Sequence, residues 1–372
     1  MFDEIGSEFW LDPGEFFDLP ETSSKQILSK FGFGEIEAAL MSSGRTACLL
    51  LLQSICPKNR IVLLPEYTCE TVITPFLNAG FEVHCYEIEH DLNIDPEKWW
   101  EKYESLDPGI VLLHSYFGFD TIDSIRKDYD KIKSRETVII EDITHSLFSR
   151  FMCDNKPDYY LASLRKWLGI PDGGFAVSCS RWNSLASPIK PDDEFVNTRQ
   201  EALKLKNRFV KEQAPDQKER FLTLLAEAEE FLDRVSTPYR MSLISMKILG
   251  QTNWNSAITK RKENYRFLEK ELAAFPTLLR PIFSNLPEDV CPLFMPVWIH
   301  GDRRVLREYL IANRIYPPIH WPLPEYFRSG DVTRINEIYD HCLSIPCDQR
   351  YTIGDMERIV TTIHDHQQAL CR

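Results

Sequence analysis

A lysine and a serine follow a buried strand at a point where the chain turns polar. Tyr159–Ala162 has the pattern of a buried strand, and Ser163 and Lys166 come directly after it. Lysine is among the least buried residue types, and out of water its amine tends to lose its proton. An unprotonated amine is a nucleophile that can form a Schiff base with a carbonyl. Taken alone, Lys166 has the alternative interpretation of a surface lysine in a loop.

An acid follows a second apolar run upstream. The run that begins at Thr137 ends in Asp142, which precedes Lys166 by 24 residues (166 − 142), about one strand–helix–strand unit. Ligands of open α/β sheets bind at the carboxyl ends of strands, where both residues fall. An amine for an aldehyde and an acid for a pyridine nitrogen are the groups that pyridoxal 5′-phosphate (PLP) requires, so the pair predicts a PLP site. A helix cap is the alternative for Asp142 alone.

A third stretch, Ser42–Ala47, places small polar residues before an apolar helix that starts near Cys48. Free backbone N–H groups at such a helix start can bind a phosphate, here with help from Gly44, Arg45 and Thr46. An ordinary helix N-cap is the alternative.

Composition restricts the classes of partner and ligand. The net charge is −13 with pI near 5.3, which argues against nucleic acid or an anionic membrane as the main partner. No apolar run approaches the length of a membrane span, and no apolar leader follows Met1. The ten cysteines show no metal-ligand spacing, so we expect a cytoplasmic protein with reduced cysteines and no metal site.

Strand and helix patterns alternate along the first half of the chain. The expected strands are Ile61–Leu64, Glu82–Tyr86, Ile110–His114, Thr137–Asp142, Tyr159–Ala162 and Phe175–Val177. This alternation predicts an α/β fold whose mainly parallel sheet is covered by helices on both faces.

Other segments differ from this pattern. We expect an extended arm at residues 1–35 and a charged helical region at residues 183–235. The predicted domains are a large one at 1–250, which includes the arm, and a smaller α+β one at 251–372. In the second, Leu293–His300 reads as a strand and a helix ends the chain.

The motifs, in this order, resemble those of fold-type I PLP-dependent enzymes, and most of all the DegT-type sugar aminotransferases. The resemblance runs from about Gly44 to the C-terminus. It rests on the stretches Ser43–Ala47, Pro65–Thr68, His114–Gly118, Glu141–His145, Ser163–Lys166, Tyr239–Ser242, Ile319–Pro322 and Leu343–Pro346.

The resemblance implies a role for several residues. Lys166 would bind the cofactor aldehyde and carry the substrate proton, and Asp142 would hold the pyridine nitrogen protonated. His145 would lie near the ring oxygen, with a core histidine as the alternative. The phosphate candidates are Gly44, Arg45, Thr46 and Ser163. Either Tyr67 or Cys69 would lie at the ring face.

The sequence also departs from the family in two places. Fewer residues separate Ser163 from Lys166 than in many members, a spacing closer to the desulfurase-like branch of the fold. Pro238 stands where the family has an asparagine that reaches the partner subunit's phosphate, so Arg240 or a backbone group would take that role.

The function implied is a homodimeric aminotransferase, with an amino acid such as glutamate as donor and a nucleotide-linked keto sugar as acceptor. His320 and Trp321 are the candidates for binding the acceptor, with packing of a Pro-rich loop as the alternative. Two other readings stay open. The first is another fold-type I enzyme, such as an amino-acid transaminase, a desulfurase or a lyase. The second is a non-catalytic protein of this fold.

Overall fold

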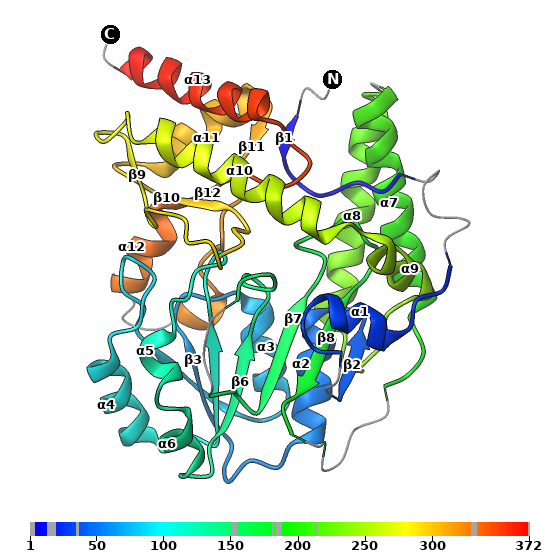
Figure 1. Ribbon diagram of the computed structural model, residues 1–372, viewed down its shortest axis with the longest axis vertical. Coiled ribbons are helices and arrows are strands. Elements are labelled where there is room, and N and C mark those ends of the chain that lie inside the picture. Colours follow the sequence, from blue (N-terminus) through cyan, green and yellow to red (C-terminus); the bar gives the residue numbers. More distant parts are fainter. Residues whose placement is uncertain are drawn as a thin grey trace.

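The computed structural model describes residues 4–12, 20–34, 37–150, 155–180, 182, 188–212, 214–328 and 333–370, with 333–336 described by their backbone alone. A large sheet lies in the lower half of Figure 1 and a small sheet lies above it.

The large sheet has seven strands in the order β2-β8-β7-β6-β5-β3-β4. Their bounds are β2 (Ala38–Met41), β3 (Ile61–Pro65), β4 (Glu82–Tyr86), β5 (Ile110–His114), β6 (Val138–Asp142), β7 (Tyr159–Ser163) and β8 (Gly174–Ser178). Strands β3 to β7 pair in parallel, whereas β8 runs antiparallel to both of its neighbours. The predicted, mainly parallel sheet is therefore confirmed.

Helices cover both faces of this sheet. They are α2 (Gly44–Ser54), α3 (Glu70–Asn78), α4 (Pro96–Leu106), α5 (Asp123–Arg126) and α6 (Tyr129–Lys133). On β5, Val111 and Leu113 enter the core that contains residues of α4, α5 and α6, whereas Ile110 and Leu112 enter the core that contains residues of α2 and α3. The alternation of side chains along each strand thus fills two separate cores, one on each face.

The small sheet is antiparallel, in the order β12-β10-β9. Its strands and the helices near it are β9 (Leu279–Pro281), β10 (Met295–Ile299), β12 (Cys342–Ile345), α10 (Trp254–Leu272), α11 (Arg303–Ala312), α12 (Thr333–His341) and α13 (Ile353–Leu370).

The N-terminal segment joins this small unit rather than the large one. Strand β1 (Ile5–Gly6) pairs in parallel with β11 (Ile315–Tyr316), and Ile5 is buried in the core of the small unit. The domain boundary at residue 250 stays a prediction, but the contacts of residues 5–6 place them with the second domain.

The predicted arm at residues 1–35 lies partly outside the described residues. Within the described part, Ser24–Lys30 forms helix α1, so an extended conformation was the wrong expectation there. The helix starts because the Ser23 side chain accepts a hydrogen bond from the Gln26 N–H, while the Gln26 side chain bonds back to the Ser23 N–H.

The charged region after the sheet forms two long helices, α7 (Asp193–Glu212) and α8 (Gln217–Arg234), followed by α9 (Leu243–Gln251). They stand beside the sheet on the right of Figure 1. Among the described residues, none of the helices combines the length and apolar character needed to cross a bilayer.

Candidate active site

Three polar side chains meet at the carboxyl edge of the large sheet because of its register. Asp142 ends β6 opposite His114, which ends the parallel neighbour β5. Ser163 ends β7 on the other side of β6. Parallel strands that end at one edge bring these side chains together, as the strand-end pattern predicted.

Asp142 is buried at this edge but remains an anion. Its Oδ1 accepts a hydrogen bond from the Thr144 N–H at 2.9 Å, and its Oδ2 lies 3.7 Å from His114 Nδ1. Burial alone would raise the pKa of this carboxyl group. The interactions with His114 and Thr144 outweigh burial and lower the pKa, so the carboxylate is ionised at neutral pH.

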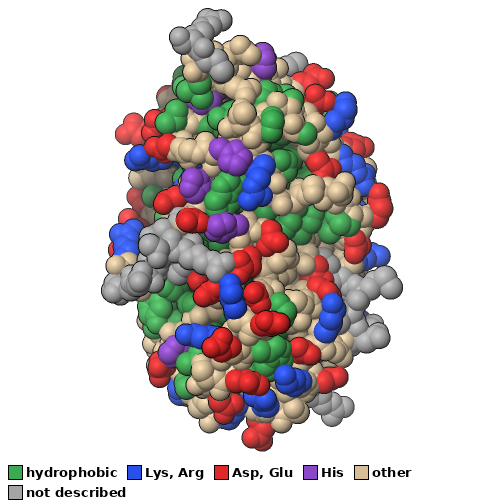
Figure 2. Space-filling model, turned by 90° about the vertical axis from the view of Figure 1, so that its left-hand side faces the viewer, with side chains coloured by type: hydrophobic (Ala, Val, Ile, Leu, Met, Phe, Trp, Pro, Cys, Tyr) green, Lys and Arg blue, Asp and Glu red, His purple; other side chains and the backbone are tan. Residues whose placement is uncertain are grey.

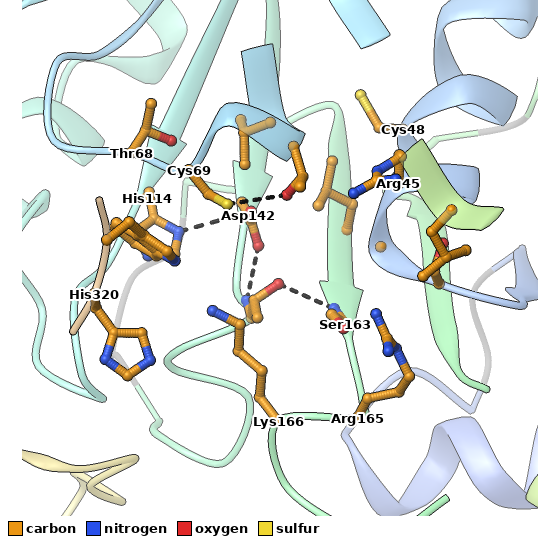
Figure 3. A pocket seen from close by; sticks show the side chains of 18 of the residues that line it. Arg45, Cys48, Thr68, Cys69, His114, Asp142, Ser163, Arg165, Lys166 and His320 are labelled. Atoms are coloured by element: carbon orange, nitrogen blue, oxygen red, sulfur yellow. Dashed lines mark hydrogen bonds and ion pairs between the residues drawn. The ribbon is translucent and has the colours of Figure 1, made fainter. Parts of the chain in front are cut away.

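Lys166 follows β7 in a turn and points toward the same edge (Figure 3). Its Nζ lies 3.1 Å from Nε2 of His145, which is fully buried. Burial is the main cause that lowers the pKa of the Lys166 amine. Burial and the nearby Lys166 and His114 also lower the pKa of His145 well below its ordinary value.

The tautomer of His145 follows from its second neighbour. The Phe117 N–H donates to His145 Nδ1 at 3.5 Å, so a neutral imidazole carries its proton on Nε2. That proton points at Lys166 Nζ, and only the neutral form of the amine has the lone pair to accept it. This arrangement stabilises the nucleophilic form of Lys166.

Two contacts hold the turn that carries Lys166. The Trp167 indole N–H donates to the Thr144 carbonyl at 2.7 Å, directly after Asp142. Further along the loop, the buried Asp172 carboxylate accepts hydrogen bonds from the Ser242 N–H and hydroxyl and from the Ser245 hydroxyl at the start of α9. The loop is therefore tied both to β6 and to the following helix.

The other end of the site is the start of helix α2. Ser43 is its N-cap and forms a reciprocal cap with Thr46, whose hydroxyl accepts from the Ser43 N–H at 2.9 Å. A Cβ on Gly44 would lie 3.1 Å from Ser163 Cβ, and one on Gly174 would lie 2.4 Å from the Ser43 carbonyl carbon. The approach at position 174 requires glycine, and the contact of Gly44 brings the helix start against Ser163.

Two arginines, each paired with a carboxylate, flank this end of the site. Arg45 pairs with Asp233 of α8 at 3.1 Å, and Arg165 pairs with Glu229 of α8 at 2.7 Å. Figure 3 shows Arg45, Arg165 and Ser163 on one side of the cavity and Lys166, His114 and His320 on the other.

A cavity of about 350 Å³ joins the two ends, a volume suited to a small ligand. It brings together most of the residues predicted from the sequence, namely Gly44, Arg45, Cys69, Asp142, Ser163, Lys166, His320 and Trp321. His145 contacts this group through Lys166 and stacks on Trp321, with ring centroids 5.2 Å apart.

Besides His145, three predicted residues do not line the cavity. The Thr46 hydroxyl is buried in the helix cap. Tyr67 is buried against Tyr116, Trp321 and Tyr339, so of the two ring-face candidates only Cys69 lies on the wall. Arg240 is exposed and donates to the Pro188 carbonyl at 3.1 Å.

His114, Arg165, Ser43 and Cys48 line the cavity, although the sequence assigned them no role of their own. The strand-end signal that identified Asp142 also applies to His114, which ends the neighbouring strand. For Arg165 no such signal exists, because sequence alone does not say which side of a turn a side chain faces.

Comparison with solved structures identifies the architecture. The chain is similar to Helicobacter pylori PseC, an aminotransferase involved in the biosynthesis of pseudoaminic acid, at 16% identity and a TM-score of 0.70, covering 98% of this chain and 100% of that one. It has the fold of an aminotransferase. Sugar aminotransferase CalS13 from Micromonospora echinospora matches at 15% identity and a TM-score of 0.64, covering 96% and 99% of the two chains. A DegT DnrJ EryC1 StrS aminotransferase from Brucella abortus matches at 17% identity and 0.63, covering 95% and 91%.

These likenesses confirm the fold class predicted from the sequence. No protein-family model and no curated protein matches the chain.

The residues present fit PLP in their chemistry. Lys166 offers an amine, Asp142 an anion, and the α2 start with Ser163 offers N–H and hydroxyl donors for a phosphate. In addition, His114 Nε2 is buried without a hydrogen-bond partner among the described residues, although its ring lies on the cavity wall. A ligand would satisfy this atom.

Proposed function

We propose that the chain is a PLP-dependent aminotransferase. The proposed substrates are an amino-acid donor, with glutamate expected, and the keto group of a nucleotide-linked sugar. The observation that carries the proposal is the buried Lys166, whose lowered pKa and contact with His145 favour a free amine beside the anionic Asp142. The sugar is supported by the solved neighbours, two of which are described as acting in pseudoaminic acid biosynthesis and as a sugar aminotransferase.

The proposed reaction balances without an external oxidant or reductant. The donor amino acid becomes a 2-oxo acid, and the sugar C=O becomes CH–NH₂. When bound, PLP supplies an aldehyde that condenses with amines, with loss of water, and a ring that accepts an electron pair. Lys166 Nζ would remove a proton from the donor carbon in the first half-reaction and pass it to the cofactor, and in the second half-reaction it would return a proton from the cofactor to the acceptor carbon. Asp142 favours the protonated ring nitrogen by its charge.

A desulfurase of the same fold is less well supported. Such an enzyme needs an accessible cysteine nucleophile near the second domain. Cys342 and Cys347 are both fully buried, and burial raises the pKa of the Cys342 thiol to about 11. Neither thiol is available to a substrate.

The direct test is covalent attachment of PLP. Purified protein mixed with PLP should absorb visible light. After borohydride reduction, the adduct mass should lie on the peptide that contains Lys166, and Lys166→Ala should abolish it. In a separate, unreduced sample of the PLP-loaded protein, glutamate should yield one 2-oxoglutarate per loaded site. An adduct on another lysine, or no binding at saturating PLP, would overturn the proposal.

We also propose that the protein is a homodimer. Arg240 lies outside its own cavity, yet its segment pairs with the end of β2, which leads into the α2 start. The neighbouring Ile189 and Leu243 are large apolar side chains that are 45% and 61% exposed. A second copy on this face would cover them and bring Arg240 toward the partner's phosphate end.

A further inference from the structure

A second cavity of about 420 Å³ adjoins the first one. The two share the walls formed by Ser163, Arg165, Lys166 and His320. The opposite wall of the second cavity includes the N-terminal segment 7–9. A molecule in the second cavity would therefore lie beside the same amine as a ligand in the first.

Arg199 of α7 lines this second cavity and is almost completely buried, with 2% of its surface exposed. Its Nη1 lies 2.8 Å from Glu229, and its Nη2 lies 3.5 Å from Glu8, a long contact. Its Nε has no hydrogen-bond partner among the described residues. A buried guanidinium with an unused donor is costly, so it favours an anion that bonds it more fully than Glu8 does.

The two glutamates are held with different strength. Glu229 Oε1 bridges Arg165 and Arg199 at 2.7 and 2.8 Å. Although burial opposes it, the charges of these arginines lower the pKa of Glu229 to about 2. Among the described residues, the Glu8 side chain makes only the long contact, and it is 48% exposed. Glu8 can therefore turn into solvent, whereas Glu229 stays in place.

The N-terminal segment itself is fixed. Lys206 donates to the Ser7 hydroxyl and the Glu8 carbonyl, and Arg350 donates to the carbonyls of Ser7 and Glu8. The backbone of the wall is thus anchored from two sides, which leaves the Glu8 side chain as its movable part.

We propose that the second cavity binds the carboxylate of the amino-acid donor, at Arg199 and Arg165, in exchange for the Glu8 side chain. The exchange replaces one carboxylate by another, so the local charge does not change. An α-amino acid carries its carboxylate on the carbon that bears the amine, so this anion must lie close to Lys166, which lines the cavity. In a nucleotide-linked sugar, more bonds separate the phosphates from the keto carbon than separate the carboxylate of an amino acid from its amine. The carboxylate therefore fits a cavity beside Lys166 better than the phosphates do. This inference rests on the proposed function and adds the site of its donor.

The test uses the full chain loaded with PLP and measures binding of succinate, an unreactive dicarboxylate, by calorimetry at constant ionic strength. Arg199→Gln should weaken binding about tenfold or more, because a charge-assisted hydrogen bond is lost. Glu8→Gln should tighten binding severalfold, because the competing anion is gone. The matched control is Glu201→Gln on the same helix, which removes a half-exposed carboxylate paired with Arg220 at 3.8 Å and should not change binding.

The inference predicts weaker succinate binding in Arg199→Gln and tighter binding in Glu8→Gln. If the two residues only stabilised the fold, their replacement would not change the affinity in opposite directions. If Arg199→Gln does not fold, the succinate affinity of Glu8→Gln still tests the inference. The Glu8 side chain is half exposed, so its replacement should leave the fold intact. Weaker binding in Glu8→Gln, or no succinate binding at all, would overturn the inference.

Uridine diphosphate provides the second arm of the test. If its affinity follows Arg199 and Glu8 while that of succinate does not, the cavity binds the acceptor's phosphates and the carboxylate assignment is wrong. The borohydride adduct on Lys166, measured in each variant, separates these outcomes from failure of the proposed function.

Discussion

Burial favours the neutral form of both central residues, and it therefore shifts their pKa values in opposite directions. It lowers the pKa of Lys166 and favours the neutral amine. The same burial would neutralise Asp142, but the contacts with His114 and Thr144 reverse the effect and keep the carboxylate charged. The site therefore combines an amine of lowered pKa with a carboxylate anion, which is the pair that PLP chemistry uses.

Replacement of Asp142 tests whether its negative charge acts on the cofactor ring. Asp142→Asn should leave PLP attached to Lys166 but slow the glutamate half-reaction by about 10²-fold or more, because the ring nitrogen loses its anion. Stopped-flow absorbance would measure the rate. Asp158→Asn is the control, since Asp158 precedes β7, at the opposite edge of the sheet, and bonds the Ile139 N–H at 2.8 Å. An unchanged rate in Asp142→Asn would mean that the acid only caps the backbone.

At the scale of elements, helix α7 anchors the N-terminal segment through Lys206. The side chain is 2% exposed and donates to Ser7 and Glu8. Burial, together with Arg350, lowers the pKa of Lys206 from 10.5 to about 7. The helix thus anchors one wall of the second cavity with an amine that ionises near neutral pH.

This pKa predicts how stability depends on pH. Between about pH 7 and 10.5 the unfolded chain keeps a proton on Lys206 that the folded protein has lost, so the free energy of unfolding rises with pH in this window. Below pH 7 both states are protonated and the contribution is constant. The slope can reach about 1.4 kcal/mol per pH unit.

Urea unfolding at pH 7, 8, 9 and 10 measures the effect. The free energy of unfolding of the wild type minus that of Lys206→Met should rise across the series. The free energy of unfolding of the wild type minus that of Lys206→Arg should rise with pH by the same amount, because arginine stays protonated in both the folded and the unfolded state. A difference that does not vary with pH would show that Lys206 ionises equally in both states.

At the scale of the whole molecule, the active cavity lies between the large sheet and the unit around the small sheet. Lys166 and Asp142 follow strands of the large sheet, whereas His320 bonds to Ser344 of β12 in the small sheet at 2.8 Å. On the face shown in Figure 2, acidic and basic side chains are interspersed, in keeping with a net charge of −13. A charged ligand is therefore bound by local groups such as Arg199 rather than by the overall charge.

The proposed homodimer is testable at this scale. Sedimentation velocity should show two copies per particle. Arg240→Ala should release PLP more readily on dialysis while the melting temperature changes little, because Arg240 is exposed in the single chain. Arg266→Ala, an exposed arginine of α10 paired with Glu288, should leave PLP retention unchanged. A monomer that retains PLP fully would contradict the dimer.

The sequence by itself determined six of the seven strands of the large sheet and the two central residues, whereas strand β2 was not expected. Strand period and strand-end position are local properties, and parallel strands must end at one edge, so Asp142 and Lys166 could be brought together without coordinates. The polar stretch that precedes helix α2 was visible for the same reason, because a cap depends on residues a few positions apart, although the helix begins at Gly44 rather than near Cys48.

Only the tertiary structure decided which neighbours complete the site. Glu229 meets Arg165 across 64 positions of sequence, and Glu8 meets Arg199 across 191. The tertiary structure also turns Tyr67 and Thr46 away from the cavity and places Cys69 on its wall. Side-chain direction and long-range contacts depend on how helices and sheets pack, and no local pattern in the sequence encodes that packing.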